Sequence, residues 1–388
     1  MNNRTSKLTL LSIIIISLIF SIFIFSSCFS QTNARTEIKI PDILGYITLK
    51  CDFHMHTVFS DGSVWPTVRV EEAWREGLDA ISITDHIEHQ YHKKDVTLDH
   101  NLSYELAKSK ATELGLILIK GAEITRSMPP GHFNAIFLKD VDPLDTEDWR
   151  DAIKAANEQG AFVFWNHPGW EAQAPNGAKW YDEHTELYEQ GQFQGIEIVN
   201  WMEYYPTVHR WALDKKLTLI GNSDVHPPIQ MDFDLANGEH RPLTIVFAKE
   251  KSVEAIKDAL LARRTAVYYQ DLLLGEEKFL KPIFRQSIEI VNPTAKIKKK
   301  GIATIQIHNK SDLILELVTD SKLEEITIPP KINLYPDKTV LFHIKGKSNK
   351  NSGKKLISIP YNVKNLSIAP DICLSIEFKI EVNFISEE

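Results

Sequence analysis

The chain has 388 residues, of which 43% are hydrophobic and 25% are charged, so it is long enough for two domains with sizeable cores. The formal net charge of -8 argues against a surface that holds nucleic acid through phosphate contacts. We therefore expect no nucleic-acid partner.

The N-terminus resembles an export signal. Two basic residues precede a run without charges over residues 8–25, which is apolar except for Thr9 and three serines. Small residues and Cys28 follow it. The alternative is an uncleaved anchor, although the run is near the short end of the roughly 17–25 residues that span a bilayer. We expect residues 1–30 to be a signal and the protein to be periplasmic or attached to the cell envelope. Cys28 resembles the lipidated cysteine of bacterial lipoproteins, but cleavage after Ser30 fits nearly as well, so a membrane tether through Cys28 stays open.

Residues 31–45 are expected to form a linker, and residues 46–285 alternate short apolar runs with helical periodicity. The expected strands cover residues 47–53, 80–84, 116–123, 132–138, 161–165, 195–199, 217–221 and 243–247. The expected helices include residues 68–74, 102–114, 147–158, 207–215 and 252–263. This alternation predicts a parallel α/β sheet or a closed barrel. Only eight residues separate Glu123 from His132, too few for a crossover helix, so the strand from His132 should be antiparallel to its predecessor.

The composition changes after Arg285. All eight Trp, all five Met and every Arg lie at or before this residue, and the remainder is rich in Lys. Short alternating runs separated by turn residues predict an antiparallel β-sandwich over residues 286–388. Its expected strands cover residues 287–291, 303–308, 313–317, 340–344, 356–359 and 372–384. We expect Cys51 and Cys373 to be buried free thiols, with no disulfide between them.

Histidines and acids follow the ends of the expected strands in the first region. His54 and His56 are two apart, so they point to the same side of an extended segment and could chelate one ion. Side chains just past the carboxyl ends of barrel strands converge on one mouth. The nine candidate metal ligands are His54, His56, Asp61, His86, Glu123, His132, His167, Asp224 and His226. They exceed the needs of one ion, and about three divalent ions fit if Glu123 bridges two. A set without cysteine suits Zn, Mn or Fe.

Five motifs resemble, in order, those of the PHP (polymerase and histidinol phosphatase) family. They are Asp52-Phe53-His54-Met55-His56-Thr57, Thr84-Asp85-His86, Gly121-Ala122-Glu123, Asn166-His167-Pro168 and Ser223-Asp224-Val225-His226. The resemblance covers roughly residues 46–270 and implies a distorted seven-stranded (β/α) barrel with a trinuclear site for phosphoester hydrolysis. It implies three ligand sets: His54, His56, Glu123 and Asp224; Glu123, His132 and His167; and Asp61, His86 and His226. Asp61 stands where many members carry a His, and the C-terminal sandwich lies outside the family core.

The expected activity is hydrolysis of a small phosphate mono- or diester, with Glu123 and Asp224 as the catalytic side chains. A hydroxide between two ions is the expected nucleophile, because metal binding lowers the pKa of water towards about 7. The candidate substrate-binding residues are Arg126, His92, Lys93 and Lys94, for which the alternative is a solvated loop cation. Trp165, Trp170, Trp180 and Trp201 either stack on a substrate ring or belong to the core. Two other functions stay open: a metallohydrolase acting on a carbon ester or amide, and a non-catalytic metal-binding surface protein.

Overall fold

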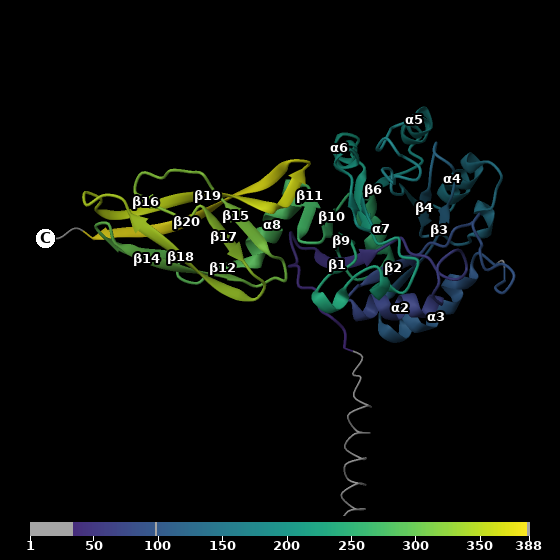
Figure 1. The fold of residues 1–388 in the computed structure, drawn as a ribbon, viewed down its shortest axis with the longest axis horizontal. Helices are drawn as coiled ribbons and strands as arrows, with labels where there is room; N and C mark the ends of the chain where they lie inside the picture. Colours follow the sequence, from purple (N-terminus) through teal and green to yellow (C-terminus); the bar gives the residue numbers. More distant parts are fainter. Residues whose placement is uncertain (1–33, 98, 386–388) are drawn as a thin grey trace, which may run out of the picture. The chain divides into compact units, whose positions relative to one another are not determined.

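The computed structural model describes residues 34–97 and 99–385 (Figure 1). The expected signal, Cys28 and the first residues of the expected linker lie outside the described residues, so export and lipidation stay predictions. Within the described ranges, no helix is both long and apolar enough to cross a membrane.

In the first region the strands of one mixed ladder were expected from the sequence, whereas those over residues 203–204, 265–269 and 272–275 were not. In order of hydrogen bonding the strands of this ladder are β1 (Ile47–Asp52), β2 (Ala80–Ile83), β3 (Ile117–Ile124), β4 (Phe133–Ile136), β5 (Phe162–Trp165), β6 (Gly195–Asn200) and β8 (Thr218–Asn222). β4 is antiparallel to both β3 and β5, as the short connection after Glu123 predicts, and the other pairs are parallel.

The chain beyond β8 meets the chain beyond β1. The backbone N–H of Asp224 donates to the His54 carbonyl at 2.9 Å, and that of His56 donates to the Val225 carbonyl at 3.0 Å. These bonds join the two segments that carry the paired ligand motifs. The chain segments that follow β8 and β1 therefore lie side by side, while the exact strand count of the barrel stays a prediction.

Helices connect most of these strands. They are α2 (Pro66–Arg75), α3 (Leu102–Leu114), α4 (Trp149–Glu158), α5 (Asp182–Glu189), α6 (Pro206–Asp214) and α7 (Val253–Leu261), and α5 was not expected from the sequence. α2 and α6 begin with proline, whose missing N–H costs nothing at that position. α4 and α7 begin after caps: Asp148 accepts from Arg150 N–H, and Ser252 accepts from Ala255 N–H. Short elements complete this region: η1 (Asp142–Leu144), β7 (Glu203–Tyr204), η2 (Ile229–Met231) and η3 (Leu235–Asn237).

A second set of strands continues the sheet from the other edge of β1. β9 (Leu243–Ala248) is antiparallel to β1 and to β10 (Thr265–Tyr269), which pairs with β11 (Leu272–Gly275). β11 then pairs in parallel with β19 (Gly353–Ala369) of the C-terminal region. The two regions therefore share one hydrogen-bonded sheet, which the change of composition after Arg285 did not predict. The helix α8 (Glu277–Ser287) spans that change and was also missed.

The C-terminal region is a β-sandwich, as expected. One sheet contains β13 (Thr294–Lys298), β15 (Leu315–Val318), β17 (Lys331–Leu334), β19 and β20 (Ile372–Ile385), and the other contains β12 (Ile288–Ile290), β14 (Ile302–Asn309), β16 (Ile326–Thr327) and β18 (Lys338–Gly346). The pairing is antiparallel except that β13 runs parallel to β20. Alternate residues of β14, β18 and β20 are buried, which is the pattern that identified them in the sequence. Cys51 and Cys373 are both free, as expected, but only Cys51 is buried. The expectation of burial was wrong for Cys373, which is half-buried near the start of β20.

Candidate metal centre

The structure brings the nine candidate ligands to one place. None of them lies further than 3.7 Å from a side-chain nitrogen or oxygen of another member. They come from the last residues of β3, from the segments that follow β1, β2, β5 and β8, and from His132, which precedes β4. Because β4 is antiparallel, its start lies beside the end of β3, and this is what places His132 next to Glu123.

The first cluster consists of His54, His56, Glu123 and Asp224. The Nε2 atom of His54 lies 3.1 Å from each of three atoms, namely His56 Nε2, Glu123 Oε2 and Asp224 Oδ1. His56 Nε2 lies 3.2 Å from Glu123 Oε2 and 3.0 Å from Asp224 Oδ1. Four ligands held about 2 Å from one ion in a tetrahedron are about 3.3 Å apart. The four donor atoms thus have the mutual spacing of a single coordination shell.

The second cluster is centred on the other oxygen of Glu123. His132 Nδ1 lies 2.8 Å and His167 Nε2 lies 3.7 Å from Glu123 Oε1. His86 Nδ1 lies 3.1 Å from Glu123 Oε2, so the compact group contains His86 in addition to His132, and His167 stands slightly back. The expected set contained His167 and not His86. Glu123 therefore contacts His132 and His167 through Oε1, and His86 and the imidazoles of the first cluster through Oε2, so it belongs to both clusters.

The third cluster surrounds Asp61. Its carboxylate lies 3.2 Å from His226 Nε2 and 3.4 Å from His86 Nε2, as the expected set requires. His56 also joins this group through Nδ1, which lies 3.8 Å from Asp61. The rings of His56 and His226 are stacked with their centroids 4.1 Å apart. His56 therefore belongs to two clusters, a role that its place in the sequence did not indicate.

The charges of the cluster depend on one another. Burial raises the pKa of Glu123, but the surrounding imidazoles, those of His86 and His54 first, outweigh this and hold the pKa well below its usual range. Burial lowers the pKa of His54, but the carboxylates, that of Asp224 first, outweigh it and raise the pKa well above its usual value. Ions bind the deprotonated imidazoles, so metal binding at this cluster would release protons.

A buried carboxylate that the sequence reasoning missed supports the first cluster. Glu197 in β6 is fully buried and accepts from His54 Nδ1 at 2.9 Å. It also accepts from the side chains of Asn200 and Asn222 and from the backbone N–H of His167, each at 2.8–2.9 Å. A carboxylate on Nδ1 leaves Nε2 of the same ring free to face an ion. Glu197 sits inside an apolar strand, and a lone acid there gives no pattern to find.

Arg69 in α2 was also missed. Its guanidinium is buried and donates to the backbone carbonyls of His56, Val225, Pro227 and His226 at 2.6–3.1 Å. One side chain thus fixes both segments that carry the paired motifs. The backbone of this region is unusual as well, because His167, Asp224 and Trp201 have φ values of 28°, 52° and 49°. Such values are uncommon for residues other than glycine and cluster at functional sites.

The four expected substrate-binding residues differ in how far their side chains are already engaged within the protein. The Arg126 guanidinium pairs with Glu88 and donates to the carbonyls of Thr125 and Thr146, so most of its donors are already engaged. Lys93 and Lys94 are exposed on a loop, and His92 beside them is half-buried. Lys93 lines a cavity of about 690 Å³ that contains none of the nine candidate ligands. A direct part in substrate binding stays a prediction for all four.

The four tryptophans divide into two pairs. Trp165 is fully buried and stacks on His184 at 3.7 Å, and Trp180 packs edge-on against it, so both belong to the core. Trp170 and Trp201 are exposed and line a cavity of about 380 Å³ together with Asp224 and His226. This cavity opens directly on the candidate metal centre.

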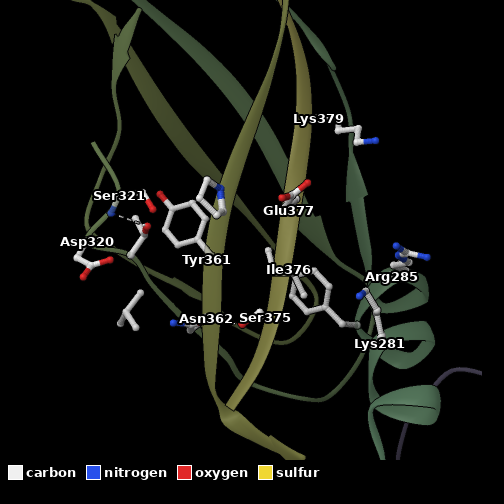
Figure 2. A pocket seen from close by; sticks show the side chains of 14 residues that line it. Lys281, Arg285, Asp320, Ser321, Tyr361, Asn362, Ser375, Ile376, Glu377 and Lys379 are labelled. Atoms are coloured by element: carbon white, nitrogen blue, oxygen red, sulfur yellow. Dashed lines mark hydrogen bonds between the residues drawn. The ribbon is translucent and has the colours of Figure 1, made fainter. Parts of the chain in front are cut away.

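A larger cavity of about 670 Å³ lies in the C-terminal region (Figure 2). Figure 2 shows Lys281 and Arg285 of α8 on one side, Asp320 and Ser321 on the other, and Glu377 and Lys379 of β20 along the groove. It contains none of the nine candidate ligands. The cavity with the chemistry of a metal centre is therefore the smaller one.

Comparisons with known proteins agree with this architecture. A crystal structure of a two-domain protein from Bacteroides vulgatus, which contains a predicted PHP-like metal-dependent phosphoesterase, is 48% identical, with a TM-score of 0.83. The match covers 89% of this chain and 99% of that chain. The chain belongs to the family of this two-domain PHP-like protein. The family described as an Ig-like domain matches residues 288–379.

Two further solved structures are more distant. A candidate metal-dependent phosphoesterase from Bifidobacterium adolescentis is 19% identical over 45% of this chain and 87% of its own, with a TM-score of 0.36. An amidohydrolase from Chromobacterium violaceum is 16% identical over 46% of this chain and 88% of its own, with the same TM-score. Neither carries an argument about this protein. No curated protein matches the chain.

Proposed function

We propose that the protein is a metal-dependent phosphoesterase that hydrolyses a small phosphate mono- or diester at a centre of about three divalent ions. The observation that carries the proposal is the first cluster, in which five of the six distances between donor atoms are 3.0–3.2 Å. Imidazoles and carboxylates so close together in a buried place are costly unless ions or protons neutralise their repulsion. The family relationship to a PHP-like protein supports the same reaction class.

Each part of the centre has a distinct task in this proposal. Glu123 would hold two ions, and His54, His56 and Asp224 would hold one of these together with it. When bound, the ions would supply a water of lowered pKa as nucleophile and stabilise charge on the phosphate. Glu197 and Arg69 keep the imidazoles and the loop backbone in place, so little reorganisation accompanies the reaction. The barrel of the expected seven strands would supply the rigid frame for these loops.

Elemental analysis followed by an ester panel tests the proposal. We expect Zn, Mn or Fe in the purified protein, and release of phosphate from phosphate esters but no cleavage of acyl esters or amides. His54→Ala and Glu123→Ala should each abolish turnover, whereas Glu254→Ala on the exposed side of α7 is the matched control. Near-normal activity in both site variants would overturn the assignment, and cleavage of an acyl ester alone would favour the carbon-ester alternative.

The metal content of two variants distinguishes the roles of Asp61 and Glu123. Asp61→Ala should leave more metal bound than Glu123→Ala, because Glu123 belongs to two of the clusters and Asp61 to one. Equal metal loss in the two variants would contradict the bridging role. The same proposal includes export, because the apolar N-terminal run precedes the barrel, and mass spectrometry of the mature protein would show whether Cys28 carries lipid.

A further inference from the structure

The cavity of about 380 Å³ beside the candidate metal centre is lined by aromatic and acidic side chains together with two of the candidate ligands. Asp224 and His226 form the side that adjoins the clusters. The Trp170 ring stands edge-on to His167 with centroids 5.2 Å apart, and lies 6.0 Å from His132. A phosphate held at the clusters would therefore place its ester oxygen and the group beyond it in this cavity.

Aromatic faces and carboxylates make up most of the remaining wall. Trp170 and Trp201 are 42% and 46% exposed, which is unusual for side chains of this size. Glu171, Glu203 and Asp232 add three carboxylates. Among the described residues that line the cavity, none is a lysine or arginine.

We propose that this cavity receives the leaving group of the substrate and that this group is a small alkylammonium alcohol, of the choline or ethanolamine type. The inference rests on the proposed function and names the substrate class of the same site. Tryptophan faces attract cations through the ring quadrupole, and carboxylates that line a cleft strengthen the local negative potential. A leaving group with its own phosphate or carboxylate would be repelled by the same wall.

The arrangement also defines how the substrate is oriented when its ester bond breaks. Water adds to phosphorus, the P–O bond to the alcohol breaks, and the alcohol oxygen takes up a proton, so that phosphate and the ammonium alcohol are the products of a monoester. The phosphate end faces the imidazoles of the clusters. The ammonium end faces Trp201 and the carboxylates of Glu171, Glu203 and Asp232. The anionic end of the substrate thus lies at the metal centre, and its cationic end lies against aromatic and acidic side chains.

Binding of free alcohols to the purified protein tests the cavity without any turnover, because they contain no phosphate ester. Choline and its uncharged isostere 3,3-dimethyl-1-butanol are titrated by calorimetry and by tryptophan fluorescence. Choline should bind about tenfold more tightly or better, because the two differ only in charge. Trp201→Leu and Glu171→Gln should each remove much of this preference, with thermal melting showing that the variants fold. Glu324→Gln, an exposed acid of the sandwich, and Trp65→Leu are the matched controls. Equal binding of the two alcohols would overturn the inference.

Hydrolysis by the metal-loaded protein provides the second arm. Phosphocholine should have at least about a tenfold higher kcat/KM than 3,3-dimethylbutyl phosphate, with the difference mainly in KM, since the ammonium group lies away from the reacting bond. Equal rates on the two esters would overturn the inference and leave the proposed function standing. If the loaded protein cleaves neither these nor p-nitrophenyl phosphate, the proposed function fails, and the choline titration still decides the chemistry of the cavity.

Discussion

The region before α8 buries its charges, and the region after it keeps them on the surface. Asp52, Arg69, Glu123, Glu197 and Arg241 are fully buried in the first region. From residue 288 to residue 385, the buried polar side chains are Asn309, Ser311 and Asn365, and none is charged. Burying a charge is costly unless a partner compensates it. The first region therefore holds a polar site at a cost in stability, while burial of apolar side chains stabilises the sandwich.

The largest effect should follow from unpairing a buried charge. Arg241 is fully buried and donates to Asp52 at 3.0 Å and to Glu76 at 2.5–3.1 Å. Asp52 also accepts from the Ser223 hydroxyl, next to Asp224. Arg241→Ala should cost about 3–5 kcal/mol of unfolding free energy, because both carboxylates lose their cation inside the protein. Chemical denaturation measures this, and the exposed Arg150→Ala, which breaks a surface pair with Glu186, is the control. A loss below about 1 kcal/mol would mean that water reaches Asp52 and that the buried-charge account is wrong.

A cavity in the sandwich should cost nearly as much and leave the site alone. Phe342 in β18 is 1% exposed and packs against Tyr361 and Phe378. Phe342→Ala should lower the unfolding free energy by about 3–4 kcal/mol, from lost burial plus the cavity that remains. Metal content at ordinary temperature should be unchanged, as elemental analysis would show. Loss of metal in this variant would contradict the division of tasks between the regions.

Whether the sequence predicts an element of these two regions depends on how long and how regular its apolar pattern is. Runs of alternating or continuous apolar residues predicted all eight strands sought in the first region and the strands around β14, β18 and β20. Short elements such as α5, where only His184 and Leu187 are buried, carry too little periodicity to stand out. The parallel pairing of β11 with β19 depends on residues about 90 positions apart (Leu273 with Leu366) and has no local signature.

The candidate site shows the same limit. The spacing of His54 and His56 identifies them in the sequence, and the position of Glu123 at the end of a strand identifies it. The distribution of ligands among clusters could not be read in this way, since it depends on ring rotation: His86 turns Nδ1 towards Glu123 and Nε2 towards Asp61. Glu197 and Arg69 support the site from ordinary positions within β6 and α2. Residues that touch a reacting group can carry a motif, but residues that hold those in place are found through contacts.

A smaller effect is expected when a supporting carboxylate is altered without being removed. Glu197→Gln keeps the shape of the side chain but offers one acceptor oxygen and an amide donor to the donors of His54, Asn222 and Asn200. Metal affinity should fall about 10–100-fold, as competition with a chelator would show. Glu189→Gln, at the exposed end of α5, is the control. Unchanged affinity would mean that His54 is oriented by packing alone.

The smallest effect belongs to the charges of the sandwich. Lys354 of β19 lies 3.2 Å from Glu381 of β20, with side chains 68% and 43% exposed. Water solvates both groups when the pair is broken, so Lys354→Ala should change the unfolding free energy by less than about 1 kcal/mol. Denaturation at low and high salt measures the change, and Glu381→Ala should give a similar result. A loss of several kcal/mol would place this pair beside Arg241 and Asp52, and the contrast between a charged interior and a charged surface would no longer describe the two regions.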